Sequence, residues 1–404
     1  MSDPASPAAS LPDVAGVAGP LAGVRILDLS SVVMGPYATQ QLGDLGADVI
    51  VVEDRSGDTN RYMSLGPVPG LSGTSLNLMR NKRSVRLDLK QDEGREALLA
   101  IAATCDVMIT NLRPGPLGRL GLTYEDVRAV RDDIVFCQAQ GFPSDSDRAE
   151  APAYDDIIQS AAGIPDLFVR QGHEPSLMPT LIADKVCGMA VQSAVLAALF
   201  HRATTGEGQR VEVPMVDVMT SFVLVEHGGG GIPEPASNTP GHLRILTSWR
   251  KPQPTADGFV HILPYHARHY QRIFEAGGRP DLAADDTRFV DRPARFANSD
   301  SLYQSVAELT QTRTTADWLA ICDADGIPAT AVATLDGLLD ALRLVEHPVA
   351  GSMREIPHPV RYSATPASVR RPAPLCGENT SEVLAEVGFA KTAIEGLRAT
   401  DAAG

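Results

Sequence analysis

A strand, a helix and a second strand follow one another near the start of the chain, and this order constrains the fold most. Residues 24–29 form an aliphatic run, residues 37–45 have the composition of a helix opened by Gly35 and Pro36, and residues 48–53 read DVIVVE. Two strands joined through a helix by short loops pair in parallel, because the crossover returns the chain to the same end of the sheet. The segment therefore predicts a βαβ unit.

The same alternation continues along the next ninety residues. Helical patterns at residues 91–104 and 124–130 alternate with strand patterns at residues 106–110 and 134–138. A row of such units is typical of an open, doubly wound α/β sheet with helices on both faces. No G-x-G-x-x-G motif follows the first strand, so a dinucleotide-binding site of the usual kind is not expected. The predicted fold class is α/β, with a Rossmann-like doubly wound large domain.

Changes in composition suggest where this domain begins and ends. Residues 1–20 are rich in Ala, Pro, Ser and Gly and lack the basic and apolar regions of a signal peptide, so we expect a disordered tail. Residues 226–257 are rich in Gly and Pro and include the run Gly228–Gly231, which fits either a flexible linker or a mobile loop over a reacting centre. The predicted divisions are a tail (1–20), a large Rossmann-like domain (21–227), a linker or loop (228–257), a small α/β domain (258–325) and a C-terminal segment (326–404).

The charge balance limits the partners of the chain. Its net charge is −15, which argues against general binding to nucleic acid or to anionic membranes. Residues 80–90 nevertheless carry five basic side chains in eleven, and this cluster fits either a phosphate anchor or a solvated strand edge. The five cysteines are scattered without metal-binding spacing, which predicts a cytoplasmic protein without a metal site.

Asp184 stands directly before the long apolar segment 185–202, whose hydrophobic residues recur at helical spacing. In that position it is expected to be the N-cap of the helix. A carboxylate kept ionised by the dipole and N–H groups of a helix N-terminus could also act as a nucleophile. The local sequence leaves both interpretations open.

Several short motifs occur in a fixed order along the chain. They are LAGVRILD (21–28), GP (35–36), LGADVI (45–50), NKRS (81–84), LDLK (87–90), NLRPG (111–115), RLGL (119–122), TGEGQ (205–209) and TADG (255–258). As an ordered set they resemble the class III CoA-transferases, or CaiB/BaiF family, which includes formyl-CoA transferase, carnitine CoA-transferase and α-methylacyl-CoA racemase. The resemblance covers nearly the whole chain.

The resemblance implies a fold and a set of partners. It implies an interlocked, ring-like homodimer, in which the C-terminal segment 326–404 returns to the large domain and the small domain lies between. An acyl-CoA thioester and a carboxylic acid are the implied substrates, with no permanently bound cofactor, nucleic acid or membrane involved.

The resemblance also implies the site residues. Asp184 falls on the catalytic aspartate, and Tyr154 and Asp155 complete the predicted catalytic group. The residues implied for CoA binding are Val33, Leu87, Asp88, Leu89, Lys90, Asn111, Leu112, Arg113, Arg119 and Gly141. Val33 replaces a glutamine that lies near the reacting carbonyl in formyl-CoA transferase, so formyl-CoA and oxalate are not the expected substrates. Asp54 replaces an arginine that contacts CoA there, so the contacts at the adenine end are expected to differ.

Three activities are compatible with these residues. In CoA transfer, an aspartate attacks a thioester and forms an aspartyl anhydride or thioester intermediate. In 2-methylacyl-CoA racemisation two acid–base groups are needed, and Tyr154 stands where the racemases have a histidine, which favours transfer. In a non-catalytic CoA-binding protein, Asp184 would only cap its helix. The sequence does not specify the acyl donor or acceptor.

Overall fold

The computed structural model describes residues 19–404, so the predicted tail lies almost entirely outside the described residues. The chain divides into two compact units. Unit 1 comprises the described residues through Ile158, together with Pro179–Met219 and Leu342–Gly404, and unit 2 comprises Gln159–Met178 and Thr220–Ala341. The two units do not follow the predicted divisions: residues 159–178, 220–227 and 326–341 cluster with unit 2.

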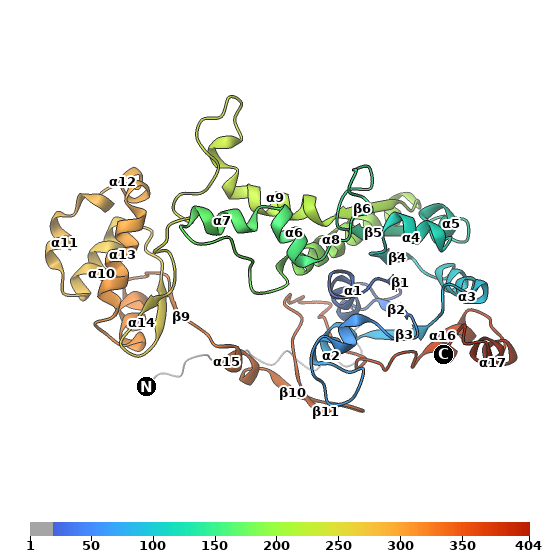
Figure 1. Ribbon diagram of the computed structural model, residues 1–404. Helices are drawn as coiled ribbons and strands as arrows, with labels where there is room; N and C mark the ends of the chain where they lie inside the picture. The colour runs from blue at the N-terminus through green and yellow to red at the C-terminus, as the bar shows by residue number, and fades with distance from the viewer. Residues whose placement is uncertain (1–18) are drawn as a thin grey trace. The chain divides into compact units, whose positions relative to one another are not determined.

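Unit 1 is built on a six-stranded sheet, which confirms the predicted α/β class (Figure 1). Its strands are β1 (Arg25–Leu29), β2 (Asp48–Glu53), β3 (Lys82–Arg86), β4 (Val107–Thr110), β5 (Val135–Gln140) and β6 (Arg210–Pro214). All neighbours pair in parallel in the order β3-β2-β1-β4-β5-β6. This is the strand order of a Rossmann-type sheet, whose order reverses between β1 and β4.

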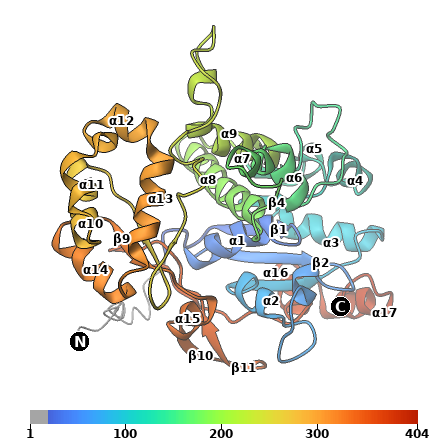
Figure 2. The same ribbon diagram turned by 60° about the vertical axis from the view of Figure 1, so that its left-hand side comes forward.

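Helices cover both faces of this sheet. One face carries α1 (Met34–Asp44), α2 (Gly73–Leu78) and α8 (Ile182–Thr205), and α1 and α8 lie side by side in both views (Figure 2). The other face packs against α3 (Asp92–Ala102), α4 (Pro114–Arg119), α5 (Tyr124–Arg128), α16 (Thr380–Glu386) and α17 (Lys391–Ala399). Side chains alternate between the two faces along each strand. Leu27 and Leu29 of β1 pack in the core formed with α3, α16 and α17, while Asp28 faces α1.

Further elements complete unit 1 and lead out of it. A 3-10 turn (Thr59–Tyr62) precedes α2, and β10 (Arg343–His347) pairs antiparallel with β11 (Gly351–Glu355). Helices α6 (Asp155–Ala161) and α9 (Met215–His227) begin in unit 1 and end in unit 2. Within the described chain, α8 alone is long and apolar enough to cross a membrane by length and composition, and here it packs against α1, β5 and β6.

The basic cluster at residues 80–90 does not form a solvated strand edge, and most of its side chains are not available to bind phosphate. Residues 82–85 of β3 are buried beneath α16. The basic side chains form ion pairs within unit 1: Arg80 with Asp44, Lys82 with Asp28, Arg83 with Asp48, and Arg86 with Asp401. Buried charges require such partners, because desolvation of an unpaired charge is costly. Only Lys90 of the cluster is exposed.

Unit 2 contains a small sheet and several helices. Its elements are α7 (Ile164–Arg170), β7 (Gln253–Pro254), β8 (Phe259–Ile262), α10 (Ala267–Ala276), α11 (Pro280–Asp285), α12 (Arg292–Ala297), α13 (Ser299–Thr310), α14 (Thr315–Ala324), β9 (Ala329–Ala331) and α15 (Leu335–Asp340). The strands form an antiparallel sheet in the order β7-β8-β9, and Trp318 and Phe274 belong to the core beside it.

Glycine and proline shape two segments of unit 2. Residues 163–177 contain α7, because Gly163 takes a φ of 82° and Pro165 stands in the first turn, where proline favours a helix start. The glycine run forms a 3-10 turn at Gly229–Gly231.

Candidate active site

A cavity of about 250 Å³ lies where the strand order of the unit 1 sheet reverses. The loops that follow β1 and β4 form part of its wall, as expected for ligand sites of open α/β sheets. Its lining consists of Ser31, Val32, Val33, Met34, Asn111, Leu112, Arg113, Pro116, Ala139, Gln140, Gly141, Ala151, Pro152, Ala153, Tyr154, Asp184 and Met215. Asp184 is the only carboxylic acid in this lining.

Asp184 reaches the cavity from the first turn of α8. It is the third residue of the helix rather than its N-cap, which is Leu181, so the predicted capping position is wrong by three residues. One turn later, a Cβ at Gly188 would lie 2.7 Å from the carbonyl oxygen of Met34. The missing side chain lets α8 approach the start of α1, and this approach brings Asp184 beside the Val33–Met34 wall.

The surroundings of Asp184 are buried and acidic. Its side chain belongs to a residue that is 9% exposed, and its backbone N–H donates a hydrogen bond to Oδ1 of Asp155 at 2.9 Å. Burial, together with the charges of Asp155 and Asp156, raises the pKa of Asp184 to about 7, against an opposing effect of Lys185. The helix N-terminus therefore does not keep Asp184 fully ionised at neutral pH, contrary to expectation.

Asn111 fixes the loop after β1. Its Oδ1 accepts the N–H of Ser31 at 3.1 Å, and its Nδ2 donates to the carbonyl of Ser31 at 2.8 Å. The next residue, Val32, has a φ of 72°, a strained conformation for a β-branched side chain. Asp58 accepts the N–H of Val32 at 3.2 Å and thereby supports this conformation.

The start of α1 borders the same cavity. No side chain caps this helix, although Val33 and Met34 both line the cavity wall. The first N–H groups of a helix have no partner within it and favour negative charge. This helix end can therefore donate hydrogen bonds to an anionic oxygen in the cavity.

A second cavity, of about 450 Å³, is lined by positively charged side chains. Its lining is Leu89, Lys90, Asp92, Arg95, Pro116, Arg119 and Leu120. Pro116 lines both cavities, so the two adjoin. An extended ligand with a phosphate-bearing end could occupy both.

The structure brings most of the predicted site residues together. The first cavity holds Val33, Asn111, Leu112, Arg113, Gly141, Tyr154 and Asp184, and the second holds Leu89, Lys90 and Arg119. Three predicted residues line neither cavity. Leu87 is buried in the core, Asp88 accepts hydrogen bonds from the N–H of Lys90 and the Gln91 amide, and Asp155 is buried behind Asp184.

Four polar residues of the cavities, Ser31, Asp92, Arg95 and Gln140, escaped the sequence analysis. Arg95 belongs to α3, where its Nη2 pairs with Oδ1 of Asp92 at 3.3 Å, and it lines the same cavity as Arg119 of α4. Gln140 is 2% exposed at the end of β5, where its Nε2 donates to the carbonyl of Phe142 at 2.9 Å. Its position at a strand C-terminus was the available signal.

Gly141 follows Gln140 and has a steric role. A Cβ at Gly141 would lie 2.2 Å from the Cβ of Ala153. Glycine therefore lets the segment 151–154 close against the end of β5 and form that side of the cavity.

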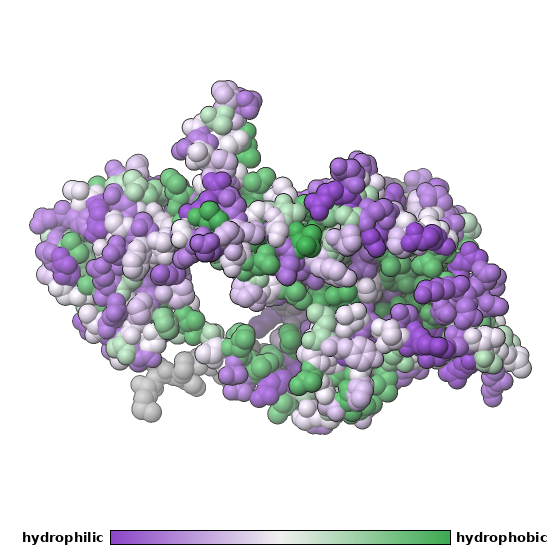
Figure 3. Space-filling view, viewed as in Figure 1, coloured by the Kyte–Doolittle hydropathy of each residue, from purple (hydrophilic) through white to green (hydrophobic). Residues whose placement is uncertain are grey.

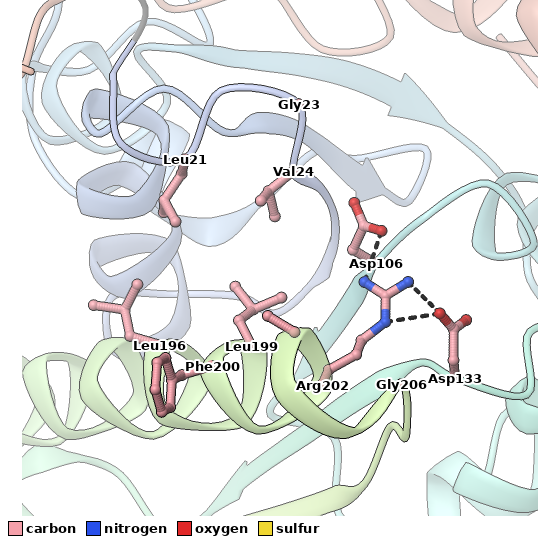
Figure 4. Close-up of a pocket in the computed structure, with 11 residues that line it drawn as sticks. Leu21, Gly23, Val24, Asp106, Asp133, Leu196, Leu199, Phe200, Arg202 and Gly206 are labelled. Atoms are coloured by element: carbon pink, nitrogen blue, oxygen red, sulfur yellow. Dashed lines mark hydrogen bonds and ion pairs between the residues drawn. The ribbon is translucent and has the colours of Figure 1, made fainter.

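A third cavity, of about 540 Å³, has a different character (Figure 4). Arg202 extends from α8 between Asp106 and Asp133 and donates to both, at 2.8 Å in each case. Its other lining is mainly apolar, including Leu196, Leu199 and Phe200. Because its charges pair with one another, this cavity offers no free group for catalysis. Among residues 19–404, no cluster of three or more His, Cys, Asp or Glu side chains could hold a metal ion.

Comparison with known proteins identifies the family of the chain. The model of CoA-transferase family III matches residues 21–380. The chain belongs to CoA-transferase family III. The resemblance noted in the sequence is thereby confirmed, and the protein is a CoA-transferase whose substrates are CoA thioesters.

Members of family III similar to this chain act on several acids. The succinate–glutarate CoA-transferase of Agrobacterium fabrum is 29% identical over 91% of this chain and 96% of its own length. The succinyl-CoA:mesaconate CoA-transferase of Haloarcula hispanica is 31% identical over 92% of this chain and 97% of its own length. The crystal structure of a CaiB/BaiF family protein from Brucella suis matches with a TM-score of 0.78 and 28% identity, covering 92% of this chain and 100% of that chain.

Proposed function

We propose that this CoA-transferase moves CoA from an acyl-CoA thioester to a free carboxylic acid, with Asp184 as the nucleophile. The observation that carries the proposal is that Asp184 is the only carboxylic acid lining a cavity that adjoins a cationic one. Relatives named for succinate, glutarate and mesaconate support a carboxylic acid as the acceptor. The identity of the acid is not part of the proposal.

The proposed reaction proceeds through covalent intermediates. An Asp184 carboxylate oxygen attacks the thioester carbonyl, the C–S bond breaks, and CoA leaves as a thiolate while an acyl–aspartyl anhydride forms. The thiolate then attacks the aspartyl carbonyl, which releases the first acid and leaves an aspartyl–CoA thioester. The second acid repeats these two steps in reverse, so Asp184 and all protons are recovered.

The residues around Asp184 fit this chemistry. The uncapped N-terminus of α1 supplies N–H groups for the oxyanion that forms at the attacked carbonyl. Lys90, Arg95 and Arg119 supply cations for the phosphates of CoA in the adjoining cavity. Asp155 holds the backbone of Asp184 and so orients the first turn of α8.

Racemisation lacks support from this geometry. It needs a second acid–base group facing the same carbon. Tyr154 lines the cavity but is 68% exposed, so its hydroxyl is not sheltered from water as a base facing a carbon acid would need. Asp155, the other candidate base, accepts a hydrogen bond from Asp184 and does not line the cavity.

A homodimer is part of the proposal, in the interlocked form implied by the family. Leucines at 335, 338 and 339 of α15 are 81%, 57% and 47% exposed, and no residue of this helix is buried. In β10, Leu344 is 64% exposed, and Figure 3 shows hydrophobic surface where Figure 1 places these elements. Clustered exposed leucines are typical of a surface covered by another chain.

The five free cysteines fit the reducing cytoplasm, where we place the enzyme.

Substitution of the nucleophile tests the proposal. Asp184→Asn should lower turnover to less than about a hundredth of the wild-type value, because an amide cannot form the anhydride. Hydroxylamine added with acyl-CoA should convert Asp184 of the wild-type protein to a hydroxamate, detectable by peptide mass spectrometry. Asp156→Asn, which removes a neighbouring carboxylate, is the matched control and should keep the modification.

Two results would contradict the assignment. Turnover by Asp184→Asn above a hundredth of wild type would exclude Asp184 as the nucleophile. Rapid exchange of the α-proton of a 2-methylacyl-CoA in heavy water, suppressed by Asp184→Asn and by Asp155→Asn, would instead favour racemisation.

A further inference from the structure

The turn between β2 and α2 contacts the wall of the candidate active site but has no role in the chemistry proposed above. It carries Asp58 and Asn60, which are 7% and 0% exposed, and Asp58 is the N-cap of the 3-10 turn Thr59–Tyr62. Both side chains form hydrogen bonds with the backbone of Val32, in the loop after β1. All of these residues belong to unit 1.

Side chains hold the loop after β1 one peptide group at a time. Asn111 binds both the N–H and the carbonyl of Ser31. The N–H of Val32 donates to Oδ1 of Asp58 at 3.2 Å and to Oδ2 at 3.3 Å, and the carbonyl of Val32 accepts from Nδ2 of Asn60 at 3.3 Å. Both peptide groups that flank Val32 are therefore fixed by side chains from other parts of unit 1.

The N–H of Val33 is the next donor along this loop. The carbonyl of Val32 and the N–H of Val33 belong to one planar trans peptide and point in opposite directions. The bond from Asn60 to this carbonyl therefore turns the N–H of Val33 away from the buried turn. Val33 lines the cavity that contains Asp184, and within residues 19–404 its N–H has no hydrogen-bond acceptor.

This arrangement costs stability, which points to a function. Val32 has a φ of 72°, which is unfavourable for a β-branched residue. Oδ1 of the fully buried Asn60 has no hydrogen-bond partner in the part of the chain that the structure describes, and a buried acceptor without a partner is also unfavourable. Strain of this kind persists only where the surrounding contacts impose it, and it is concentrated at active sites.

The turn is fixed firmly enough to impose the strained conformation. The N–H of Asp58 donates to Oε1 of Glu53, the last residue of β2, at 2.9 Å. Arg61 donates to both carboxylate oxygens of Glu53 at 2.6 Å, and both residues are buried. Oγ of Ser72, the N-cap of α2, donates to the carbonyl of Asn60 at 2.6 Å. The turn is thereby joined to the sheet and to the start of α2.

We propose that Asp58 and Asn60 are positioning residues for the attack on the thioester, an inference that rests on the CoA transfer proposed above. They hold the N–H of Val33 toward the carbonyl oxygen of the acyl group at Asp184. That oxygen gains negative charge as the carboxylate attacks, and a donor fixed in advance stabilises the charge without having to reorient. Neither Asp58 nor Asn60 lines the cavity, so both act through the backbone of Val32.

A purely structural role for Asp58 makes a different prediction. As an N-cap, its Oδ1 accepts the N–H of Asn60 at 2.7 Å, and serine or asparagine would also cap the turn. Asparagine keeps an oxygen that reaches the N–H of Val32, whereas the shorter serine does not. Asp58→Ser and Asp58→Asn therefore separate capping from positioning.

The first measurement is the steady-state kinetics of the full chain. Acetyl-CoA and succinyl-CoA are compared as donors with glutarate as the acceptor, and the faster donor is used. Asp58→Ser should lower kcat about ten- to hundredfold and change the KM for acyl-CoA less than about threefold, because the oxyanion exists only in the transition state and intermediate. Asn60→Ala should behave like Asp58→Ser, and Asp58→Asn should keep kcat within about fivefold of wild type.

Thr123→Ala is the matched control for loss of a cap. Thr123 caps α5 in the same unit and lines neither the cavity of Asp184 nor the cationic cavity. Its substitution should leave kcat unchanged.

The second measurement does not depend on activity. Hydrogen exchange of the peptide that covers residues 30–36 should be at least about tenfold faster in Asp58→Ser than in wild type, because the N–H of Val32 loses its acceptor. Asp58→Asn should exchange like wild type. The affinity of Asp58→Ser for CoA, measured by calorimetry, should stay within about threefold of wild type, because the phosphates bind in the cationic cavity.

Three results would overturn the inference. They are a kcat of Asp58→Ser within about threefold of wild type, an equal loss of kcat in Asp58→Ser and Asp58→Asn, or unchanged exchange at residues 30–36. Failure of the proposed function would appear separately, as turnover retained by Asp184→Asn, and it would not alter the exchange rates.

Discussion

At the scale of single residues, the proposed role of Asp184 as nucleophile depends on its protonation state, because only an ionised carboxylate can attack a thioester. Burial and two neighbouring carboxylates raise its pKa to about 7. A carboxylate in this state is more basic than an ordinary aspartate and remains about half ionised at neutral pH. The site therefore combines a stronger nucleophile with a dependence on pH that an exposed aspartate would not show.

The rate should report this pKa. Below pH 7, kcat/KM should rise about tenfold per pH unit, because only the ionised form of Asp184 attacks, and it should level off above pH 7. Asp156→Asn removes a negative charge that raises the pKa, so its profile should shift to lower pH. A profile that is flat between pH 5 and 8 would contradict this assignment.

Stability provides an independent measurement of the same pKa. Because the folded pKa of Asp184 lies above its unfolded value, the protonated form favours folding, and this contribution is lost as the pH rises through about 7. At pH 8, Asp184→Asn should therefore unfold at higher urea concentration than wild type, with a gain of about 1–4 kcal/mol. Near pH 4 the two proteins should be nearly equal in stability.

At the scale of elements, the site depends on how closely helices approach one another. Gly188 lets α8 lie against the start of α1, and α3, α4 and the turn before α3 place Arg95, Arg119 and Lys90 at one cavity. Side chains from different helices therefore line one cavity only because the helices lie close together.

The positions of Lys90 and Arg119 at the second cavity lead to a prediction about CoA binding. Lys90→Ala and Arg119→Ala should each raise the KM for acyl-CoA about three- to thirtyfold with kcat changed less than twofold, because the phosphates are bound alike in substrate and transition state. Lys391→Ala in α17 is the control, since that side chain is 90% exposed and lines neither cavity. An unchanged KM in both variants would place the CoA phosphates elsewhere.

At the scale of the whole molecule, the exposed leucines of α15 predict association of two chains. Leu335→Glu with Leu338→Glu should weaken the homodimer at least about tenfold, because charges would replace buried apolar contacts. The mass should be measured by light scattering after refolding from guanidinium, since interlocked chains cannot separate without unfolding. Leu65→Glu is the control at a residue that is 98% exposed in a loop. A wild-type protein that stays monomeric at all concentrations would contradict the proposed dimer.

The sequence alone determined most of the local structure. The alternation of apolar runs and helical patterns predicted β2 at Asp48–Glu53 with its observed bounds and β4 at Val107–Thr110 to within one residue, because local propensity and periodicity suffice for such segments. The ordered motifs predicted the family. They also gave the residues that now line the two cavities, including Asn111, Arg113 and Asp184.

The tertiary structure alone decided which charges are free to act. The sequence shows five basic residues at positions 80–90, but only the packing of β3 shows that four of them pair with Asp28, Asp44, Asp48 and Asp401. Conversely, Arg95 becomes a cavity residue only through the neighbouring helix. The pKa of Asp184 likewise depends on burial and on carboxylates nearly thirty residues earlier in the chain. Ion pairing and desolvation depend on distance in space, which a linear pattern of residues does not contain.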